Sequence, residues 1–336
     1  MAEWFKACHR LLVRAPNWLG DVVMSLPALE AVRRAAPEVH LTLALPGHLA
    51  ELFAGAEDVD ETLGLDRGAR SVLRLGRLFR ERGFDSALLL PNSFGSALAV
   101  RLAGIPRRTG YARDGRSWML THAVPCDSRR RGLHQVEYYL ELAAELGAPL
   151  EFDRARTVRL FAPRAARQQV RELLAAERRR PDAPLCVLAP CAIGAGKEWP
   201  AESFGRLAAM LWRRGMEVVV TGAPDEGEKT AAVAAAARAN GGEVMDLAGR
   251  NSVAQMAALF EVAAVFAGND SGPTHLAGAM GLPALGIFVR TDPALYLALG
   301  PRARAIGGVG AMPAPEEVRE VLEALAAQRA GESADG

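Results

Sequence analysis

The sequence predicts an α/β protein with two doubly wound domains, each built on a parallel sheet. Short apolar runs rich in β-branched residues alternate with longer helical patterns, which is typical of strands covered by helices on both faces. The alternation stops near 152–184 and then restarts. A chain of 336 residues is long enough for roughly two domains of ordinary size.

In the first half, apolar runs predict the strands and amphipathic runs predict the helices. We expect strands at Leu11–Val13, His40–Leu45 and Ala87–Leu90, and helices at Val22–Ala35 and Gln135–Leu146. The stretch 152–184 contains Arg179, Arg180, Pro181 and one polar helix near Ala165–Glu177, so we place the passage between domains there.

The second half repeats the pattern and ends on a well-marked helix. We expect strands at Leu185–Ala189, Glu217–Thr221, Val244–Leu247, Ala264–Ala267 and Ala284–Phe288. We expect helices at Ala201–Arg214, Glu226–Ala239, Val253–Val262, after Gly272 and at Pro315–Arg329. The predicted domains are therefore 1–160 and 161–330, followed by a disordered tail at 331–336.

The composition excludes several classes of protein. A net charge of +1 argues against a general nucleic-acid binder. No run of about 18 uncharged apolar residues and no secretory leader is present, so we expect a cytoplasmic protein, with peripheral membrane contact left open. None of the cysteines forms a close CxxC pair, so we expect reduced thiols and no metal site: Cys8, Cys126, Cys186 and Cys191.

In doubly wound domains ligands bind at the carboxyl ends of the strands, and two such loops carry charged candidates. Asp21 opens the helix after the first strand, where it acts either as an N-cap or as a general base toward a hydroxyl. The loop Leu188–Pro200 combines small residues with Lys197, one of only three lysines among 40 basic residues. This loop is either an anion-binding loop or a flexible surface turn, and it is not a Walker A motif.

Two further loops follow strands of the second half. Gly268–Ala277 begins a helix and offers Asp270, Ser271 and Thr274, while backbone N–H groups at a helix start suit a phosphate. His275 in this loop is read first as a hydrogen-bonded structural group. In Thr221–Lys229, the acidic side chains either accept hydrogen bonds from ribose hydroxyls or complement the helix dipole.

A group of arginines is spread over the loops predicted for the first domain. Such side chains are either solvated surface or contacts for an anionic acceptor or lipid headgroups. The group consists of Arg101, Arg107, Arg108, Arg113, Arg116 and Arg129–Arg131.

Several segments in order, from Leu11 to Pro293, resemble glycosyltransferase family 9, the ADP-heptose:lipopolysaccharide heptosyltransferases. The matching segments are Pro16–Asp21, Leu90–Leu98, Ala103–Gly110, Lys197–Pro200 and Asn269–His275. The resemblance implies the GT-B fold, in which two Rossmann-like domains face each other across a cleft. The first domain then binds the acceptor and the second binds the nucleotide-sugar, with the option that the last helix packs back on the first domain.

The resemblance also implies a reaction and its residues. An inverting transferase with no metal and no cofactor would move heptose from ADP-heptose to heptosyl-Kdo2-lipid A. Asp21 would be the general base, Lys197 would neutralise the leaving pyrophosphate and Asp270 would hold heptose hydroxyls. The other donor contacts would be Asp225, Glu226, Leu247, Ser271, Gly272, Thr274 and His275. The acceptor contacts would be Asn17, Asn92, Ser93, Arg113 and Arg116.

Some residues depart from the family pattern. Cys191 and Ile193 occupy the turn of the phosphate loop, Arg290 lies in Phe288–Thr291, and Pro273 stands where a bulkier apolar residue is common. A related transferase with another donor or acceptor, a nucleotide-sugar epimerase, or a non-catalytic nucleotide-sugar-binding protein therefore stay open as alternatives. As partners we expect an ADP-sugar and the lipopolysaccharide core at the inner membrane face, with the protein working as a monomer.

Overall fold

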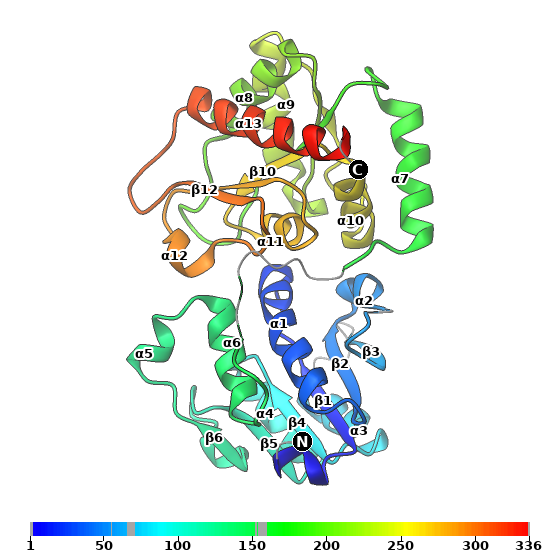
Figure 1. Ribbon diagram of the computed structural model, residues 1–336, viewed down its shortest axis with the longest axis vertical. Coiled ribbons are helices and arrows are strands. Elements are labelled where there is room, and N and C mark those ends of the chain that lie inside the picture. Colours follow the sequence, from blue (N-terminus) through cyan, green and yellow to red (C-terminus); the bar gives the residue numbers. More distant parts are fainter. Residues whose placement is uncertain (1–2, 55, 66–70, 152, 154–159, 335–336) are drawn as a thin grey trace. The chain divides into compact units, whose positions relative to one another are not determined.

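The computed structural model describes residues 3–54, 56–65, 71–151, 153 and 160–334 of the chain (Figure 1). The chain divides into two compact units, Met1–Asp153 and Arg154–Gly336. Each unit contains one six-stranded sheet whose strand pairings are all parallel. The predicted doubly wound α/β class is confirmed for both units.

The first unit alternates strands and helices along the chain. Its strands are β1 (Arg10–Arg14), β2 (His40–Pro46), β3 (Glu61–Leu65), β4 (Ser86–Leu89), β5 (Arg107–Tyr111) and β6 (His122–Val124). Its α-helices are α1 (Leu19–Ala35), α2 (Gly47–Phe53), α3 (Val72–Glu81), α4 (Phe94–Leu102), α5 (Ser128–Arg131) and α6 (Gln135–Ala144). Short 3-10 turns lie at η1 (Glu3–Ala7) and η3 (Ser117–Met119).

The second unit repeats this organisation. Its strands are β7 (Leu185–Ala189), β8 (Glu217–Val220), β9 (Met245–Asp246), β10 (Val265–Asn269), β11 (Ala284–Phe288) and β12 (Ala303–Gly307). Its α-helices are α7 (Arg164–Glu177), α8 (Ala201–Arg213), α9 (Gly227–Ala239), α10 (Val253–Val262), α11 (Gly272–Ala279), α12 (Pro293–Tyr296) and α13 (Pro315–Ala334). The 3-10 turn η4 (Pro224–Glu226) precedes α9.

Both sheets have the same strand order. The first runs β3-β2-β1-β4-β5-β6 and the second runs β9-β8-β7-β10-β11-β12, which is the Rossmann order in each case. The order reverses between β1 and β4 and between β7 and β10. At such a switch point the loops after the two strands diverge and leave room for a ligand beyond their carboxyl ends.

The core of the first unit follows from the period of two along its strands. Leu12, Ala44, Ala87 and Leu89 point to one face of the sheet and pack against Phe79 of α3 and the alanines of α4. On the other side, α1 packs along α6. Both faces are therefore covered, which explains why the strands are apolar throughout.

The second core is assembled in the same way. Cys186, Leu188, Val218 and Val220 pack under α8, α9 and α13. Helix α13 contacts α8, β10 and β11 of its own unit through Val318, Leu322 and Leu325. Residues 331–334, which were expected in a disordered tail, form the last turn of α13 instead. Residues 335–336 of the expected tail lie outside the described residues.

Two details of the prediction are corrected. Asp21 is the third residue of α1 and Trp18 holds the N-cap position, so the N-cap role considered for Asp21 is wrong. Arg101 lies in α4, Arg107 and Arg108 lie in β5, and the segment at 129–131 belongs to α5, so these arginines are not in loops. The four cysteines are free, as expected.

Candidate active site

The candidate donor site lies at the switch point of the second sheet. Strands β7 and β10 pair so that Ala189 lies beside Gly268, which brings the two following loops together. The buried amide of Asn269 connects them, because Asn269 Nδ2 donates to the Pro190 carbonyl at 2.6 Å and Oδ1 accepts from the Trp199 N–H at 2.9 Å. The loop with Lys197 is thus fixed to the end of β10.

Asp270 is the centre of a buried polar cluster at this point. Its Oδ2 accepts hydrogen bonds from Lys197 Nζ at 2.9 Å and from Thr291 Oγ1 at 2.7 Å. His275 Nε2 lies 3.6 Å from Oδ1. Burial by itself would raise the pKa of Asp270, but the hydrogen bond and charge of His275, with the bonds from Thr291 and Lys197, outweigh it and lower the pKa to about 2. Asp270 is therefore a carboxylate at neutral pH.

Helix α11 begins directly beside this carboxylate. Ser271 is its N-cap, yet its side chain makes no capping hydrogen bond, and its Oγ is buried with no partner among the described residues. His275 Nδ1 is likewise buried and unpartnered in the described part of the chain. Thr274 Oγ1 donates to the Asn269 carbonyl, so this hydroxyl serves the fold. The backbone N–H groups at Ser271 and Gly272 lie at the start of α11, a position that suits an anion.

The structure brings Lys197, Asp270, Ser271, Gly272 and His275 together, and it places the other predicted donor residues along the same sheet edge. Asp225 and Glu226 lie in η4 after β8, where Asp225 is exposed and Glu226 Oε2 accepts from the Ala223 N–H at 2.7 Å. Leu247 follows β9, but its side chain is buried and its N–H donates to the Val220 carbonyl. We therefore remove the Leu247 side chain from the candidate donor contacts.

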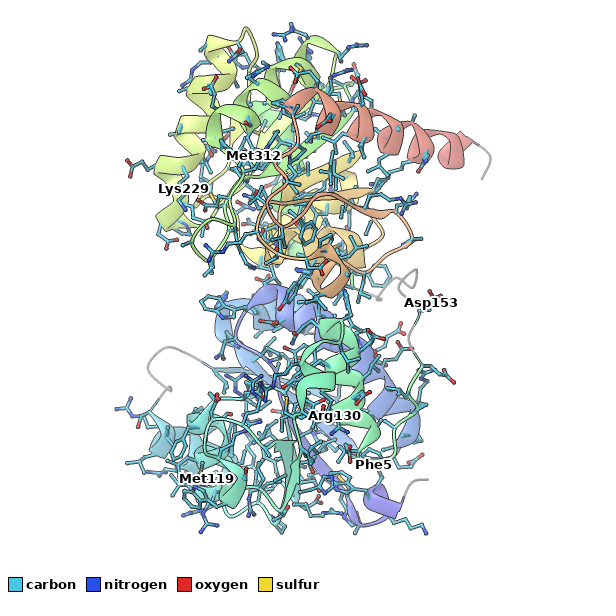
Figure 2. All side chains as sticks on the ribbon, turned by 90° about the vertical axis from the view of Figure 1, so that its left-hand side faces the viewer. Phe5, Met119, Arg130, Asp153, Lys229 and Met312 are labelled. Atoms are coloured by element: carbon cyan, nitrogen blue, oxygen red, sulfur yellow. The ribbon has the colours of Figure 1, made fainter. Side chains whose placement is uncertain are left out.

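Further residues, to which the sequence analysis gave no role, surround the loop that carries Lys197. Thr291 and the ring of Tyr296, 5.8 Å from Lys197 Nζ, come from the segment after β11. Arg290 Nη1 donates to the Ala195 carbonyl at 2.9 Å. Lys229 of α9, labelled in Figure 2, pairs with Glu198 at 2.5 Å, and Glu198 also accepts from the Ala192 N–H. The segments Phe288–Thr291, Lys197–Pro200 and Thr221–Lys229 had been singled out from the sequence, whereas nothing in the sequence indicated Tyr296.

The candidate acceptor site lies at the switch point of the first sheet. Asp21 is half-buried in the first turn of α1, and Tyr139 Oη of the neighbouring helix α6 donates to Asp21 Oδ1 at 3.3 Å. A capping box of His134 and Glu137 starts α6 and so fixes the position of Tyr139. Burial, together with the charge of Asp21, keeps the pKa of Tyr139 well above its usual range, so the phenol stays a donor.

The loop after β4 is fixed by a buried arginine. Arg116 Nε donates to the Tyr111 carbonyl at 2.9 Å, and its Nη groups reach the Pro91 carbonyl and Asn92 Oδ1. Burial lowers the pKa of Arg116 to about 10. Because this side chain is fully buried, the expected direct contact between Arg116 and an acceptor does not fit the structure. Arg116 positions Asn92 instead.

The remaining predicted acceptor residues lie in the same loops. Asn92 Nδ2 donates to Tyr138 Oη at 3.0 Å, and the hydrogen bond with Tyr138 raises the pKa of Arg113. Ser93 is exposed and caps α4 by accepting from the Ser96 N–H. Asn17 is exposed in the loop after β1 and accepts from Arg14. These side chains thus follow β1, β4 and β5, which are neighbours in the sheet.

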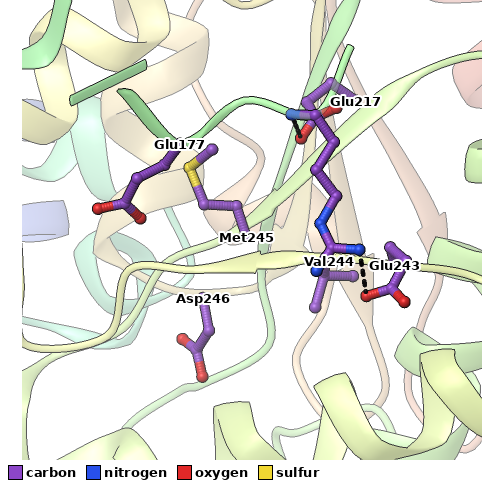
Figure 3. Close-up of a pocket in the computed structure, with 7 residues that line it drawn as sticks. Glu177, Glu217, Glu243, Val244, Met245 and Asp246 are labelled. Atoms are coloured by element: carbon purple, nitrogen blue, oxygen red, sulfur yellow. Dashed lines mark hydrogen bonds and ion pairs between the residues drawn. The ribbon is translucent and has the colours of Figure 1, made fainter. Parts of the chain in front are cut away.

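A cavity of about 210 Å³ lies elsewhere in the second unit, near the edge strand β9 (Figure 3). Its lining includes Glu217, whose carboxylate accepts from the N–H groups of Arg179 and Arg180, and Glu243, which pairs with Arg179 at 3.4 Å. The other charged residues at this cavity are Glu177 and Asp246. A lining dominated by carboxylates does not suit a diphosphate, so this cavity is not the donor site.

In the part of the chain that the structure describes, no three His, Cys, Asp or Glu side chains are grouped so that they could hold a metal ion. No described helix is long and apolar enough to cross a bilayer.

Comparison with known proteins gives a consistent picture. The family model "Glycosyltransferase family 9 (heptosyltransferase)" matches residues 72–325. Lipopolysaccharide heptosyltransferase 2 of Salmonella typhimurium is 28% identical over 305 residues, covering 88% of this chain and 87% of that protein. Its namesake from Escherichia coli K12 is 28% identical over 321 residues, with 88% and 87% covered.

A solved structure is similar over nearly the whole chain. The structure of E. coli ADP-heptose lps heptosyltransferase II superposes with a TM-score of 0.81 at 26% identity, and the match covers 95% of this chain and 99% of that one. The similarity thus extends over both sheets described above.

Proposed function

Since the chain belongs to glycosyltransferase family 9, we propose that it transfers heptose from ADP-heptose to the lipopolysaccharide inner core, as a transferase of the heptosyltransferase II type. The acceptor would be heptosyl-Kdo2-lipid A. One observation carries the donor half of this proposal. Lys197 and Asp270, which lie 73 positions apart in the sequence, meet at 2.9 Å at a Rossmann switch point, where nucleotides bind.

The chemistry of the donor site follows from charge. When the bond from heptose to ADP breaks, negative charge builds up on the pyrophosphate, and the Lys197 ammonium with the N–H groups at the start of α11 would stabilise it. Asp270 would then accept hydrogen bonds from heptose hydroxyls. Asp225 is the better candidate for the ribose, since one Glu226 oxygen is already engaged by Ala223.

The acceptor half rests on Asp21. Its carboxylate would take the proton of the attacking hydroxyl while that oxygen forms a bond to the anomeric carbon and ADP leaves from the opposite face, which inverts the configuration. The hydrogen bond from Tyr139 would hold the carboxylate in the required direction. We propose that the reaction needs no metal and no cofactor, and that the protein works as a monomer at the cytoplasmic face of the inner membrane.

The first prediction tests the role of Asp21. Asp21→Asn keeps the shape of the side chain but cannot accept a proton, so transfer should fall by about 10²-fold or more. The affinity for ADP-heptose should not change, because the acceptor proton plays no part in donor binding. We would measure ADP release with the lipid acceptor and donor binding by calorimetry, with ADP-heptose compared against UDP- and GDP-sugars.

The matched control is Glu51→Gln, a change of the same kind on the exposed side of α2 in the same unit. It should leave both readings unchanged. Full transfer by Asp21→Asn would remove Asp21 from the reaction, and preference for a UDP- or GDP-sugar would overturn the proposed donor. Activity that disappears with a chelator and returns with one divalent cation would contradict the metal-free mechanism.

A further inference from the structure

Exposed aromatic rings lie in three segments of the first unit that follow neighbouring strands of its sheet. Five large apolar side chains are clearly exposed among the described residues of the first unit, and three of these are aromatic: Trp18, Phe94 and Trp118. They lie in the segments that follow β1, β4 and β5, which are consecutive strands of the sheet. Of these three, Trp18 stands nearest to Asp21 in the sequence.

Two of these rings form a defined patch with a cation. The ring centres of Phe94 and Trp118 lie 6.4 Å apart, and the guanidinium of Arg101 lies 5.2 Å from the Trp118 ring centre. The exposed fractions are 45% for Phe94 and 59% for Trp118, and Arg101 is exposed as well. Trp118 stands beside the fully buried Met119, labelled in Figure 2, which fixes this turn to the core.

The patch continues onto helix α3. The side chain of Val72 lies next to Gly95, and Gly76 lies close to Leu102, so α3 and α4 run side by side. Leu73, at the start of α3, is 72% exposed. We call Phe94, Trp118 and Arg101 the aromatic–arginine patch, which helix α3 with the exposed Leu73 adjoins.

The charge on the helices around the patch is mainly positive. Helices α3 and α4 carry Arg74, Arg77, Arg80 and Arg101 but a single acidic residue, Glu81, which pairs with Arg77. Tryptophan and phenylalanine with arginine are the side chains that settle in the headgroup region of a bilayer. Positive charge around them favours a surface with anionic lipids. A large exposed apolar group of this kind is unusual on a protein without a partner there.

We propose that the aromatic–arginine patch docks the protein onto an anionic phospholipid bilayer. This inference rests on the proposed function, since a lipid-borne acceptor is what makes bilayer contact useful. The sugar acceptor of lipid A remains within a short distance of the membrane surface. Docking through the patch therefore keeps the protein within reach of a lipid-borne acceptor.

The test uses vesicles without any acceptor, so that binding is read separately from activity. The full chain is sedimented with phosphatidylcholine vesicles that contain or lack phosphatidylglycerol. Wild type should bind the anionic vesicles, and Phe94→Ser with Trp118→Ser should reduce this affinity by about tenfold or more. Arg101→Ala should weaken binding to anionic vesicles only. The thermal unfolding temperature should not change, because the replaced side chains are exposed.

The matched control is Leu150→Ser, an equally exposed apolar residue of the same unit, 57% accessible. It lies next to Glu151, which pairs with Arg34 in the last turn of α1. This variant should bind vesicles like wild type. If Leu150→Ser loses as much affinity for anionic vesicles as the double variant does, the inference is overturned.

An activity measurement separates this inference from the function on which it rests. The double variant should transfer heptose to a deacylated, water-soluble acceptor at the wild-type rate but lose activity on vesicle-borne acceptor. If the chain binds vesicles through the patch but transfers no heptose, the proposed function fails alone. If transfer occurs and vesicle binding is absent or unaffected by the double variant, the docking inference fails alone, and association of the chain with itself or with another protein through this patch becomes the explanation.

Discussion

The ammonium group of Lys197 is held in one place by three neighbours. It pairs with Asp270 at 2.9 Å and lies 5.8 Å from the Tyr296 ring centre, while Gly194, with φ +116°, lies close to its alkyl chain. Arginine keeps the charge but replaces a compact ammonium with a wide planar group. We expect Lys197→Arg to fold normally and to lose about tenfold or more in kcat/KM for ADP-heptose, measured by steady-state kinetics.

Lys229→Arg provides the control for this prediction. Lys229 forms an exposed ion pair with Glu198, which arginine can also make, so kinetics should remain near wild type. Unchanged kcat/KM in Lys197→Arg would mean that a diffuse positive charge is sufficient at this position.

The low pKa of Asp270 predicts how stability depends on pH. The folded-state pKa of about 2 lies below the ordinary value of 3.8, so the stabilisation is complete above that ordinary value and is lost as pH falls through about 2. The difference corresponds to about 2 kcal/mol at pH 7. The free energy of unfolding of wild type should therefore exceed that of Asp270→Asn at pH 7, and this gap should shrink by about half near pH 3.

Denaturant unfolding of both proteins at the two pH values measures this gap. Asp225→Asn, a change at an exposed carboxylate of the same unit, should differ little from wild type in its free energy of unfolding. This small difference should not shrink between pH 7 and about pH 3. A gap between wild type and Asp270→Asn that stays constant with pH would show that Asp270 acts through packing or hydrogen bonds alone.

Some site residues could be predicted from the sequence and others could not. Asp21, Lys197 and Asp270 stand in segments that follow strands, where position along the chain already implies the sheet edge. Tyr139 and Thr291 reach the same carboxylates from other elements, at separations of 118 and 21 residues, so only tertiary packing brings them there. Arg116 was misassigned because sequence does not tell whether a long polar side chain is buried.

At the scale of elements, the contact between α8 and α9 depends on a missing side chain. A Cβ on Gly205 would lie 2.3 Å from Ala236 Cβ and 2.8 Å from the Ala237 nitrogen, which is closer than atoms can approach. Gly205→Ala must therefore separate the two helices, and we expect it to lower the free energy of unfolding by about 1–3 kcal/mol in a urea titration.

Gly227 is the natural control because it begins α9 and has open space around it. Gly227→Ala should leave stability unchanged or raise it by up to about 1 kcal/mol, as alanine favours a helix. If both alanine variants behave alike, the close packing of α8 on α9 does not limit stability.

The predicted elements were those with strong apolar patterns, such as Leu185–Ala189, which coincides with β7. Strand β5 was not predicted because its sequence begins with two arginines. Arg107 fits into the strand because its guanidinium donates hydrogen bonds to Asp85 and to the Trp4 carbonyl. Strand β12 was not predicted because it is an edge strand, and its mostly exposed side chains give no apolar pattern. Both cases depend on partners elsewhere in the chain, which a local pattern does not contain.

At the scale of the whole molecule, the two sheets share one strand order. The alternating pattern predicted the doubly wound α/β class but not this order. The order of strands depends on which neighbours pair, and pairing is set by contacts distant in sequence. The restart of the pattern after 152–184 did indicate that the chain forms two compact units.

The separate cores have a consequence for how such proteins diversify. One core cluster draws on residues between Leu12 and Leu120, the other on residues between Cys186 and Ala326, so no side chain belongs to both. We therefore expect a substitution in the loops of one unit to leave the core of the other unchanged. If donor and acceptor bind to separate units, as proposed above, a lineage can change the acceptor unit while it keeps the donor unit, and chimaeras joined between the units test this.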